Sequence, residues 1–240
     1  MQKYISLSTN VLILSAQNRI MIRIKKCIAP VSYFPPIHYF AAWLVADTFF
    51  FEAHENYQKG SFRNRCLIVT SQGTTTLSIP LLQGKNEQQP IQEVLISEPK
   101  IWQKQHWQSL QTAYGSAPFW EHYAPKIEKL IQLETTNFFT LAQQSCFFCA
   151  DLLHTELRKK ATYTTEFISA ISKDAVTTDI FLFEPFLKLK TLKQLQAPKY
   201  SQVFSDRNTF TPYASILDLL LCHGNQSLEI LYQYAETLEF

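Results

Sequence analysis

Residues 24–51, IKKCIAPVSYFPPIHYFAAWLVADTFFF, decide the fold. Residues 24–31 alternate loosely and end beside Pro30, which predicts a strand running into an aromatic, proline-containing loop. Apolar residues then recur at helical spacing from Ile37 to Val45, and Pro36 suits the first turn of a helix. Residues 48–51 form a second apolar strand. Strand, helix and strand at this length predict a βαβ unit with parallel strands and a right-handed crossover.

The rest of the chain adds a hairpin and then helices. Residues 66–70 and 75–79 flank a short connection that contains Gly73, which predicts antiparallel pairing. Residues 91–96 predict another strand. Helical periodicity follows at 99–114, 118–132 and 136–158, then after Thr211 and Pro212, and again from residue 226. We therefore predict an α/β fold: a mixed β-sheet opened by a βαβ unit plus a hairpin, with a helical C-terminal half.

No linker composition marks a domain boundary inside the chain. We expect a single domain over residues 21–240, in which residues 21–98 form the sheet part and residues 99–240 the mainly helical part. Residues 1–20 read as a dispensable N-terminal extension, because Met21 directly precedes the first predicted strand. The sequence leaves open whether Met1 or Met21 is the natural start.

The composition excludes several classes of protein. The 240-residue chain is 46% hydrophobic and carries 22 basic against 20 acidic residues, a balance without the excess charge of nucleic-acid-binding proteins. No apolar run is long enough for a membrane span. The five cysteines predict a reducing, cytoplasmic location, and Cys146 and Cys149 read as core thiols, so we expect no metal site.

The segment from His54 to Arg65 places many ionisable side chains against an apolar strand. Strand alternation puts Arg65 on the same face as Leu67, which predicts an inward-pointing guanidinium. A buried guanidinium needs an acidic partner or an anionic ligand. Asp218, which interrupts an apolar helix face, and Asp47 are the candidate partners for a structural ion pair.

The same segment supplies candidates for catalysis and binding. His54 or His38 could transfer a proton, with Glu55 or Glu52 as the group that orients the imidazole. Anion-binding candidates are Lys59, Arg63 and Arg65, with Asn64 beside them. The alternative is a solvated loop with one structural arginine. These residues predict a small-molecule substrate that is anionic or sugar-linked.

Aromatic residues provide a candidate wall for a sugar ring. Trp102 and His106 are four residues apart on a predicted helix and therefore share one face, and Tyr33 lies in the loop after the first strand. The alternative for Trp102 is ordinary core packing. No cofactor-binding motif is present, so the sequence leaves the cofactor unknown and the oligomeric state open.

Four ordered blocks spanning about residues 28–235 resemble the WbqC-like proteins, especially the branch common in Bacteroidetes. The blocks are 33–40 with Ala46-Asp47; 54–65 with 78–80; 102–107 with Ala113-Tyr114; and 202–206 with 215–220 and Gly224. The family takes its name from a gene cluster for surface polysaccharide (O-antigen) synthesis. The resemblance therefore implies a transferase that acts on an activated or nucleotide-linked sugar. The alternative is a non-catalytic binding or scaffold protein of the same pathway.

Overall fold

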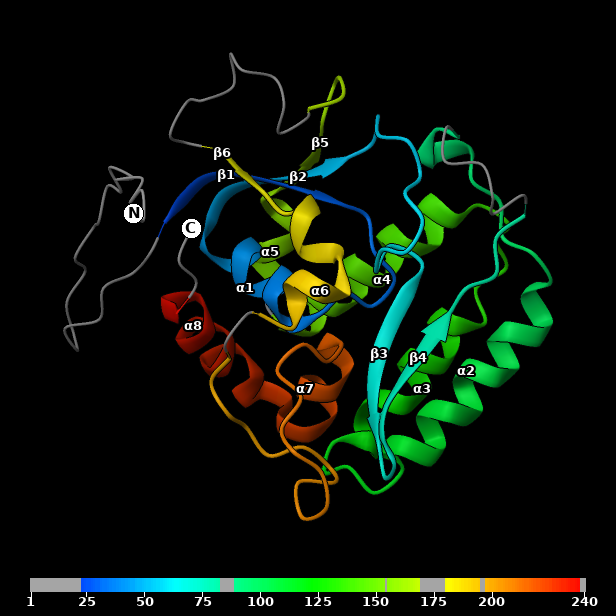
Figure 1. Ribbon diagram of the computed structural model, residues 1–240, viewed down its shortest axis with the longest axis vertical. Helices are drawn as coiled ribbons and strands as arrows, with labels where there is room; N and C mark the ends of the chain where they lie inside the picture. Colours follow the sequence, from blue (N-terminus) through cyan, green and yellow to red (C-terminus); the bar gives the residue numbers. More distant parts are fainter. Residues whose placement is uncertain (1–22, 83–88, 154, 169–179, 195–196, 238–240) are drawn as a thin grey trace.

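The computed structural model describes residues 23–82, 89–153, 155–168, 180–194 and 197–237 (Figure 1). The predicted βαβ unit is present as β1 (Ile24–Pro30), α1 (Ile37–Val45) and β2 (Ala46–Glu52). β1 and β2 are parallel, in a register that runs from Ile24 opposite Ala46 to Pro30 opposite Glu52. Every residue of α1 is buried, which explains why its sequence is apolar on all sides.

Two short strands that the sequence analysis missed complete this sheet. β5 (Ala161–Tyr163) pairs in parallel with β2, and β6 (Ile180–Leu182) pairs in parallel with β1. The resulting order is β5-β2-β1-β6. A strand of three residues is too short to show an alternation of polar and apolar residues in the sequence. β5 and β6 are therefore recognised only by their pairing with the central strands.

The hairpin forms a separate antiparallel pair, β3 (Arg65–Thr70) and β4 (Gly73–Ser78). The protein is therefore a mixed α/β fold with parallel and antiparallel sheets and a helical C-terminal half. The Tyr114 hydroxyl accepts a hydrogen bond of 3.0 Å from the Val69 amide, which ties the hairpin to the helix beside it. Figure 1 shows the parallel sheet at the top and the hairpin with two helices at the right.

The predicted helices between residues 99 and 158 are confirmed with small changes in their bounds. They are α2 (Pro99–Tyr114), α3 (Trp120–Ile131), α4 (Phe138–Leu153) and α5 (Thr155–Lys159). The later elements are η3 (Glu184–Leu187), α6 (Leu189–Leu192), α7 (Ile216–His223), η4 (Gly224–Gln226) and α8 (Ser227–Thr237).

Two local predictions were wrong. Residues 91–96 form the 3₁₀ turn η1 (Ile91–Glu93) and isolated bridges, because their backbone pairs with scattered partners such as Asn137. Helix α7 begins at Ile216, after Ser215, because residue 215 bridges to Pro36 and its amide donates to the Leu67 carbonyl. The Ser215 hydroxyl accepts from the Leu217 amide and so caps the helix.

The core is one cluster that extends from the parallel sheet to the hairpin and the helices. Trp43 of α1 is fully buried and stacks on Phe49 of β2 at a centroid distance of 4.5 Å. All five cysteines are buried and unoxidised. No described helix has the length and hydropathy needed to cross a membrane. The predicted extension, residues 1–20, lies outside the described residues.

Candidate functional site

A pocket of about 440 Å³ lies at the carboxyl ends of β1, β2 and β6. The register places it there, because Pro30 faces Glu52 and Ile28 faces Leu182 at the ends of the paired strands. Open α/β sheets bind ligands at this edge. The volume is typical of a small-molecule site. The lining residues are Ile28, Pro30, Glu52, Glu55, Gln58, Phe167, Ile168, Leu182, Glu184 and Pro185.

One wall of the pocket is built on a buried ion pair. The Arg63 guanidinium is fully buried and donates from Nε and Nη2 to the two carboxylate oxygens of Glu55, at 2.7 and 2.6 Å. Burial raises the pKa of Glu55, while the hydrogen bonds from Arg63 act to lower it. Because both oxygens of Glu55 are engaged, this carboxylate serves to hold Arg63 in place.

Glu184 follows β6 and lines the same pocket. Its side chain is 33% exposed, and Oε1 lies 3.9 Å from Nη2 of Arg63, beyond hydrogen-bond distance. Within the described part of the chain, Oε1 of Glu184 and Nη1 of Arg63 are both buried without a hydrogen-bond partner. Buried polar atoms normally have a hydrogen-bond partner. These two atoms without one therefore mark this wall as the place where a ligand could form the missing hydrogen bonds.

Glu52 joins the end of β2 to the loop after β5. Its carboxylate accepts hydrogen bonds from the His54 amide, the Thr164 hydroxyl and the Ile168 amide, at 2.8, 2.8 and 3.0 Å. The exposed imidazole of His54 donates from Nε2 to the Thr164 carbonyl at 3.1 Å. Glu52 therefore positions Phe167 and Ile168 at the pocket, and His54 lies at its margin.

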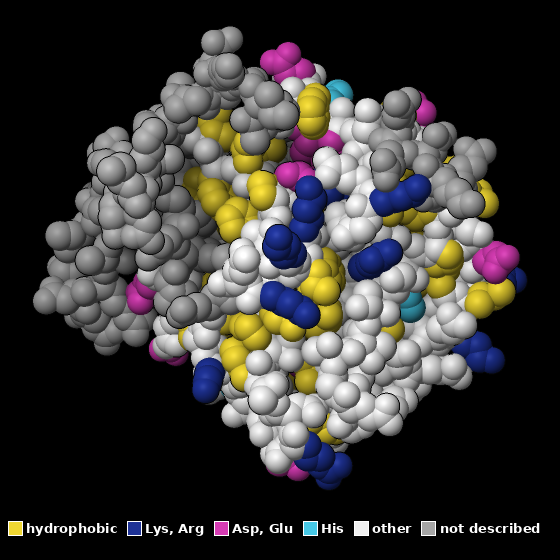
Figure 2. Space-filling view, viewed as in Figure 1, with side chains coloured by type: hydrophobic (Ala, Val, Ile, Leu, Met, Phe, Trp, Pro, Cys, Tyr) yellow, Lys and Arg dark blue, Asp and Glu magenta, His cyan; other side chains and the backbone are white. Residues whose placement is uncertain are grey.

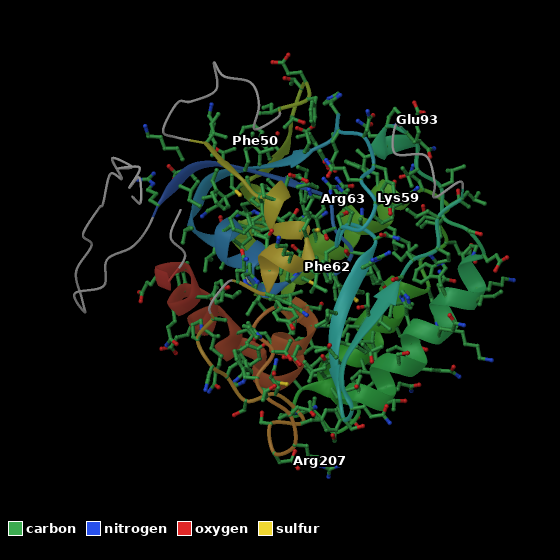
Figure 3. The ribbon with its side chains drawn as sticks, in the orientation of Figure 1. Phe50, Lys59, Phe62, Arg63, Glu93 and Arg207 are labelled. Carbon is green, nitrogen blue, oxygen red and sulfur yellow. The ribbon has the colours of Figure 1, made fainter. Side chains whose placement is uncertain are left out.

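Two basic residues lie close in sequence to pocket-lining residues, and a third begins β3. Lys59, Arg65 and Lys188, which we name the basic rim, are exposed. Lys59 directly follows the lining residue Gln58, and Lys188 bridges to Ser61 through the backbone. Figure 3 shows Lys59 and Arg63 close to the start of β3. Figure 2 shows acidic side chains directly above several Lys and Arg side chains on this face.

The inward orientation predicted for Arg65 was wrong. Arg65 is exposed at the first position of β3, whereas Cys66, Leu67, Ile68 and Val69 are all buried, so this strand has no solvent face to phase it. The buried guanidinium belongs to Arg63, two residues earlier, in the segment that leads into the strand.

Neither predicted acidic partner of Arg65 pairs with it. Asp47 forms an ion pair with Arg23 at the surface. Asp218 is fully buried and accepts hydrogen bonds from three neutral groups: the hydroxyls of Tyr114 and Tyr200, at 3.0 and 2.8 Å, and the Gln202 amide at 2.8 Å. Burial raises the pKa of Asp218, and these three donors act to lower it. The buried carboxylate of Asp218 is therefore satisfied by neutral hydrogen-bond donors, whereas the sequence predicted a cationic partner.

The predicted aromatic residues meet one another but lie in the interior. The Tyr33 hydroxyl is 3.2 Å from Nδ1 of His106, and the rings of Tyr33 and Trp102 meet edge to face at 6.1 Å. Nε2 of His106 donates to the Ser78 carbonyl, so Nδ1 is the acceptor. Burial lowers the pKa of His106 to about 4. These three residues are buried and line no part of the pocket.

His38 and Asn64 are also interior residues. His38 is fully buried against Tyr234 of α8, its ring nitrogens have no hydrogen-bond partner in the described chain, and burial lowers its pKa to about 3. Asn64 donates to the Ile79 carbonyl and accepts from the Tyr57 hydroxyl. Of the predicted site residues, Glu52 and Glu55 line the pocket; Arg63 supports its wall, and His54 and Lys59 are each adjacent in sequence to a lining residue.

Comparison with known proteins places the chain in a family. The model of the WbqC-like protein family matches residues 31–182, well over half of the chain. The chain belongs to the WbqC-like protein family. It is also 25% identical over 228 residues to the uncharacterised protein Rv1507c of Mycobacterium tuberculosis, covering 86% of this chain and 97% of that protein. No solved structure matches.

The WbqC-like region contains most of the pocket. It runs from the end of β1 to the end of β6 and includes Glu52, Glu55 and Phe167. Glu184 lies two residues beyond it, and the fourth predicted block, which contains Asp218, also lies outside. The sequence analysis missed Glu184. Its signal is an acidic residue directly after the apolar run 180–183, the same pattern in which Glu52 follows residues 48–51.

Proposed function

We propose that this WbqC-like protein is a transferase that acts on an activated, nucleotide-linked sugar during the assembly of a surface polysaccharide of the O-antigen type. The observation that carries the proposal is the pocket at the carboxyl edge of the parallel sheet, with carboxylates on its wall and the basic rim beside it. These two surfaces suit the two halves of a nucleotide-linked sugar.

The pocket suits the sugar half of such a donor. Carboxylate oxygens are good acceptors for sugar hydroxyls, and Pro30, Phe167 and Leu182 offer apolar surface for the faces of the ring. None of the lining residues is a lysine or an arginine. A diphosphate placed inside would therefore meet carboxylates of like charge.

The basic rim suits the diphosphate half. Lys59, Arg65 and Lys188 carry positive charge on exposed side chains; Lys59 directly follows the lining residue Gln58, and Lys188 lies three residues after the lining residue Pro185. Arginine can hold phosphate oxygens in bidentate fashion, and lysine acts as a point charge. We therefore propose, as the sequence predicts, that Lys59 and Arg65 bind the anionic group, and that Arg63 supports the pocket wall.

Glu184 is the first candidate for proton transfer. A nucleophilic hydroxyl or amine attacks the anomeric carbon, the nucleoside diphosphate leaves with the electrons of the broken carbon–oxygen bond, and a base takes the proton of the nucleophile. Glu184 lines the pocket and its Oε1 lacks a hydrogen-bond partner among the described residues, so it is placed to accept this proton. His54, at the margin, is the second candidate.

The test is a binding and turnover screen. We expect nucleoside diphosphate sugars to stabilise the full chain by about 2.7 kcal/mol at a hundred times their dissociation constant. The same compounds should release nucleoside diphosphate when an acceptor is present. Lys59→Ala with Lys188→Ala should weaken binding, whereas Lys100→Ala, an exposed lysine on α2, should not.

The alternative function is a non-catalytic binding or scaffold protein of the same pathway. The buried, bidentate pair of Arg63 and Glu55 favours it, because such a pair is also what a purely structural polar network contains. Stabilisation without nucleoside diphosphate release would support a binding protein. No stabilisation by any nucleotide-linked sugar would contradict the transferase proposal.

A further inference from the structure

We infer that the sugar bound in this pocket carries an amino group, and that its ammonium form is recognised by Glu184, which leaves the proton transfer to His54, the second candidate base. The inference rests on the proposed function and adds to it the class of sugar. Three observations carry it: the charge balance of the wall, the unpaired oxygen of Glu184, and the unpaired nitrogen of Arg63.

The charge balance of the pocket wall is negative. Glu52, Glu55 and Glu184 line the pocket, and Arg63 is the cation that contacts this wall among the described ion pairs. Arg63 gives its two short hydrogen bonds to Glu55. Glu52 is satisfied by two backbone amides and a hydroxyl, which are neutral. Glu184 is therefore the lining carboxylate that has a buried oxygen without a hydrogen-bond donor among the described residues.

The two orphaned atoms define what a ligand should offer. Oε1 of Glu184 needs a donor, and Nη1 of the fully buried Arg63 needs an acceptor. The two side chains are neighbours, since Nη2 of Arg63 lies 3.9 Å from Oε1 of Glu184. A sugar with an amino group next to a hydroxyl presents a charged donor and an acceptor side by side.

An ammonium group satisfies this wall better than a hydroxyl group. Both can donate to Glu184, but a positive charge also offsets the excess of carboxylates in a partly buried place. Hydrogen bonds between charged groups are stronger than those of a neutral hydroxyl. We expect an amino sugar to bind about tenfold to a hundredfold more tightly than the same sugar with a hydroxyl in that position.

The experiment uses matched pairs of nucleoside diphosphate sugars. The two members of each pair differ in one group, an amino or a hydroxyl group on carbon 2, 3 or 4 of the sugar. Their dissociation constants are measured by calorimetry on the full chain. For at least one pair we expect the amino member to bind more tightly, and we expect this preference to fall as the pH rises through the pKa of the sugar's own amine.

Glu184→Gln should remove the preference for the amine, because the amide oxygen still accepts a hydrogen bond from either group but carries no negative charge. Glu93→Gln, an exposed glutamate on η1, is the matched control and should keep the preference. Unchanged melting temperatures establish that both variants are folded. Equal binding of both members in every pair would overturn the amine inference and leave the proposed function standing. Failure of all pairs to bind would overturn both.

Discussion

At the scale of single residues, the structure exchanges the roles of two arginines. Arg63 is fully buried in a bidentate pair with Glu55, and Arg65 is exposed at the start of β3. The sequence predicted that Arg65 is the buried arginine of this segment, and that prediction was wrong, because the buried guanidinium belongs to Arg63. Residues 66–69 of β3 are all apolar, so alternation of polar and apolar residues cannot show which face of the strand points inward. Which of the two arginines is buried therefore depends on how the preceding loop packs.

The two arginines should differ sharply in their effect on stability. Arg63→Ala leaves Glu55 as an unpaired buried carboxylate, and we expect it to lower the free energy of unfolding by about 3–5 kcal/mol. Arg65→Ala removes an exposed side chain and should change it by about 0.5 kcal/mol or less. Urea denaturation measures both. Similar losses for the two variants would contradict the exchange of roles.

At the scale of elements, the ends of the parallel strands build the pocket. Glu52 ends β2, and its carboxylate holds the loop after β5 through Thr164 and Ile168. Glu184 lies two residues after the end of β6. Two strands far apart in sequence thus deliver an acidic residue to one edge, because parallel strands end on the same side of a sheet.

Glu52→Ala should release the loop that carries Phe167. Three donors lose their acceptor, so we expect a loss of about 3 kcal/mol in the free energy of unfolding and faster hydrogen exchange at the Ile168 amide. Glu166→Ala, an exposed change in the same loop, is the control and should leave that amide protected. Equal exchange in parent and Glu52→Ala would mean that other contacts hold the loop.

At the scale of the whole molecule, two histidines are enclosed in the core as neutral groups. Burial lowers the pKa of His106 from 6.5 to about 4 and that of His38 to about 3. Between the unfolded and folded pKa values the unfolded chain binds more protons than the folded one. Stability therefore falls as the pH decreases from 6.5 toward 4.

The contribution of His106 can be isolated by substitution. We expect the free energy of unfolding of the parent, relative to His106→Gln, to decrease by about 3 kcal/mol between pH 6.5 and pH 4. His122→Gln, an exposed histidine on α3, should follow the parent across this range. Urea denaturation at several pH values tests this, and parallel curves for parent and His106→Gln would contradict it.

The sequence by itself determined the long, strongly patterned features: the βαβ unit, the hairpin, helices α2 to α4 and membership of the WbqC-like family. It also singled out the segment that contains Glu55 and Arg63. These features follow from local periodicity and from ordered motifs, which a linear chain displays directly.

Only the tertiary structure determined where the pocket lies and which residues line it. The short strands β5 and β6 exist through pairing with β2 and β1, and Glu184 becomes a site residue when β6 docks beside β1. The partners of Asp218 and the buried position of Arg63 likewise depend on contacts between segments remote in sequence. Several side chains in one segment can have similar local sequence patterns. Long-range packing determines which of them is buried and hydrogen-bonded, because these contacts form only when elements that are distant in sequence meet.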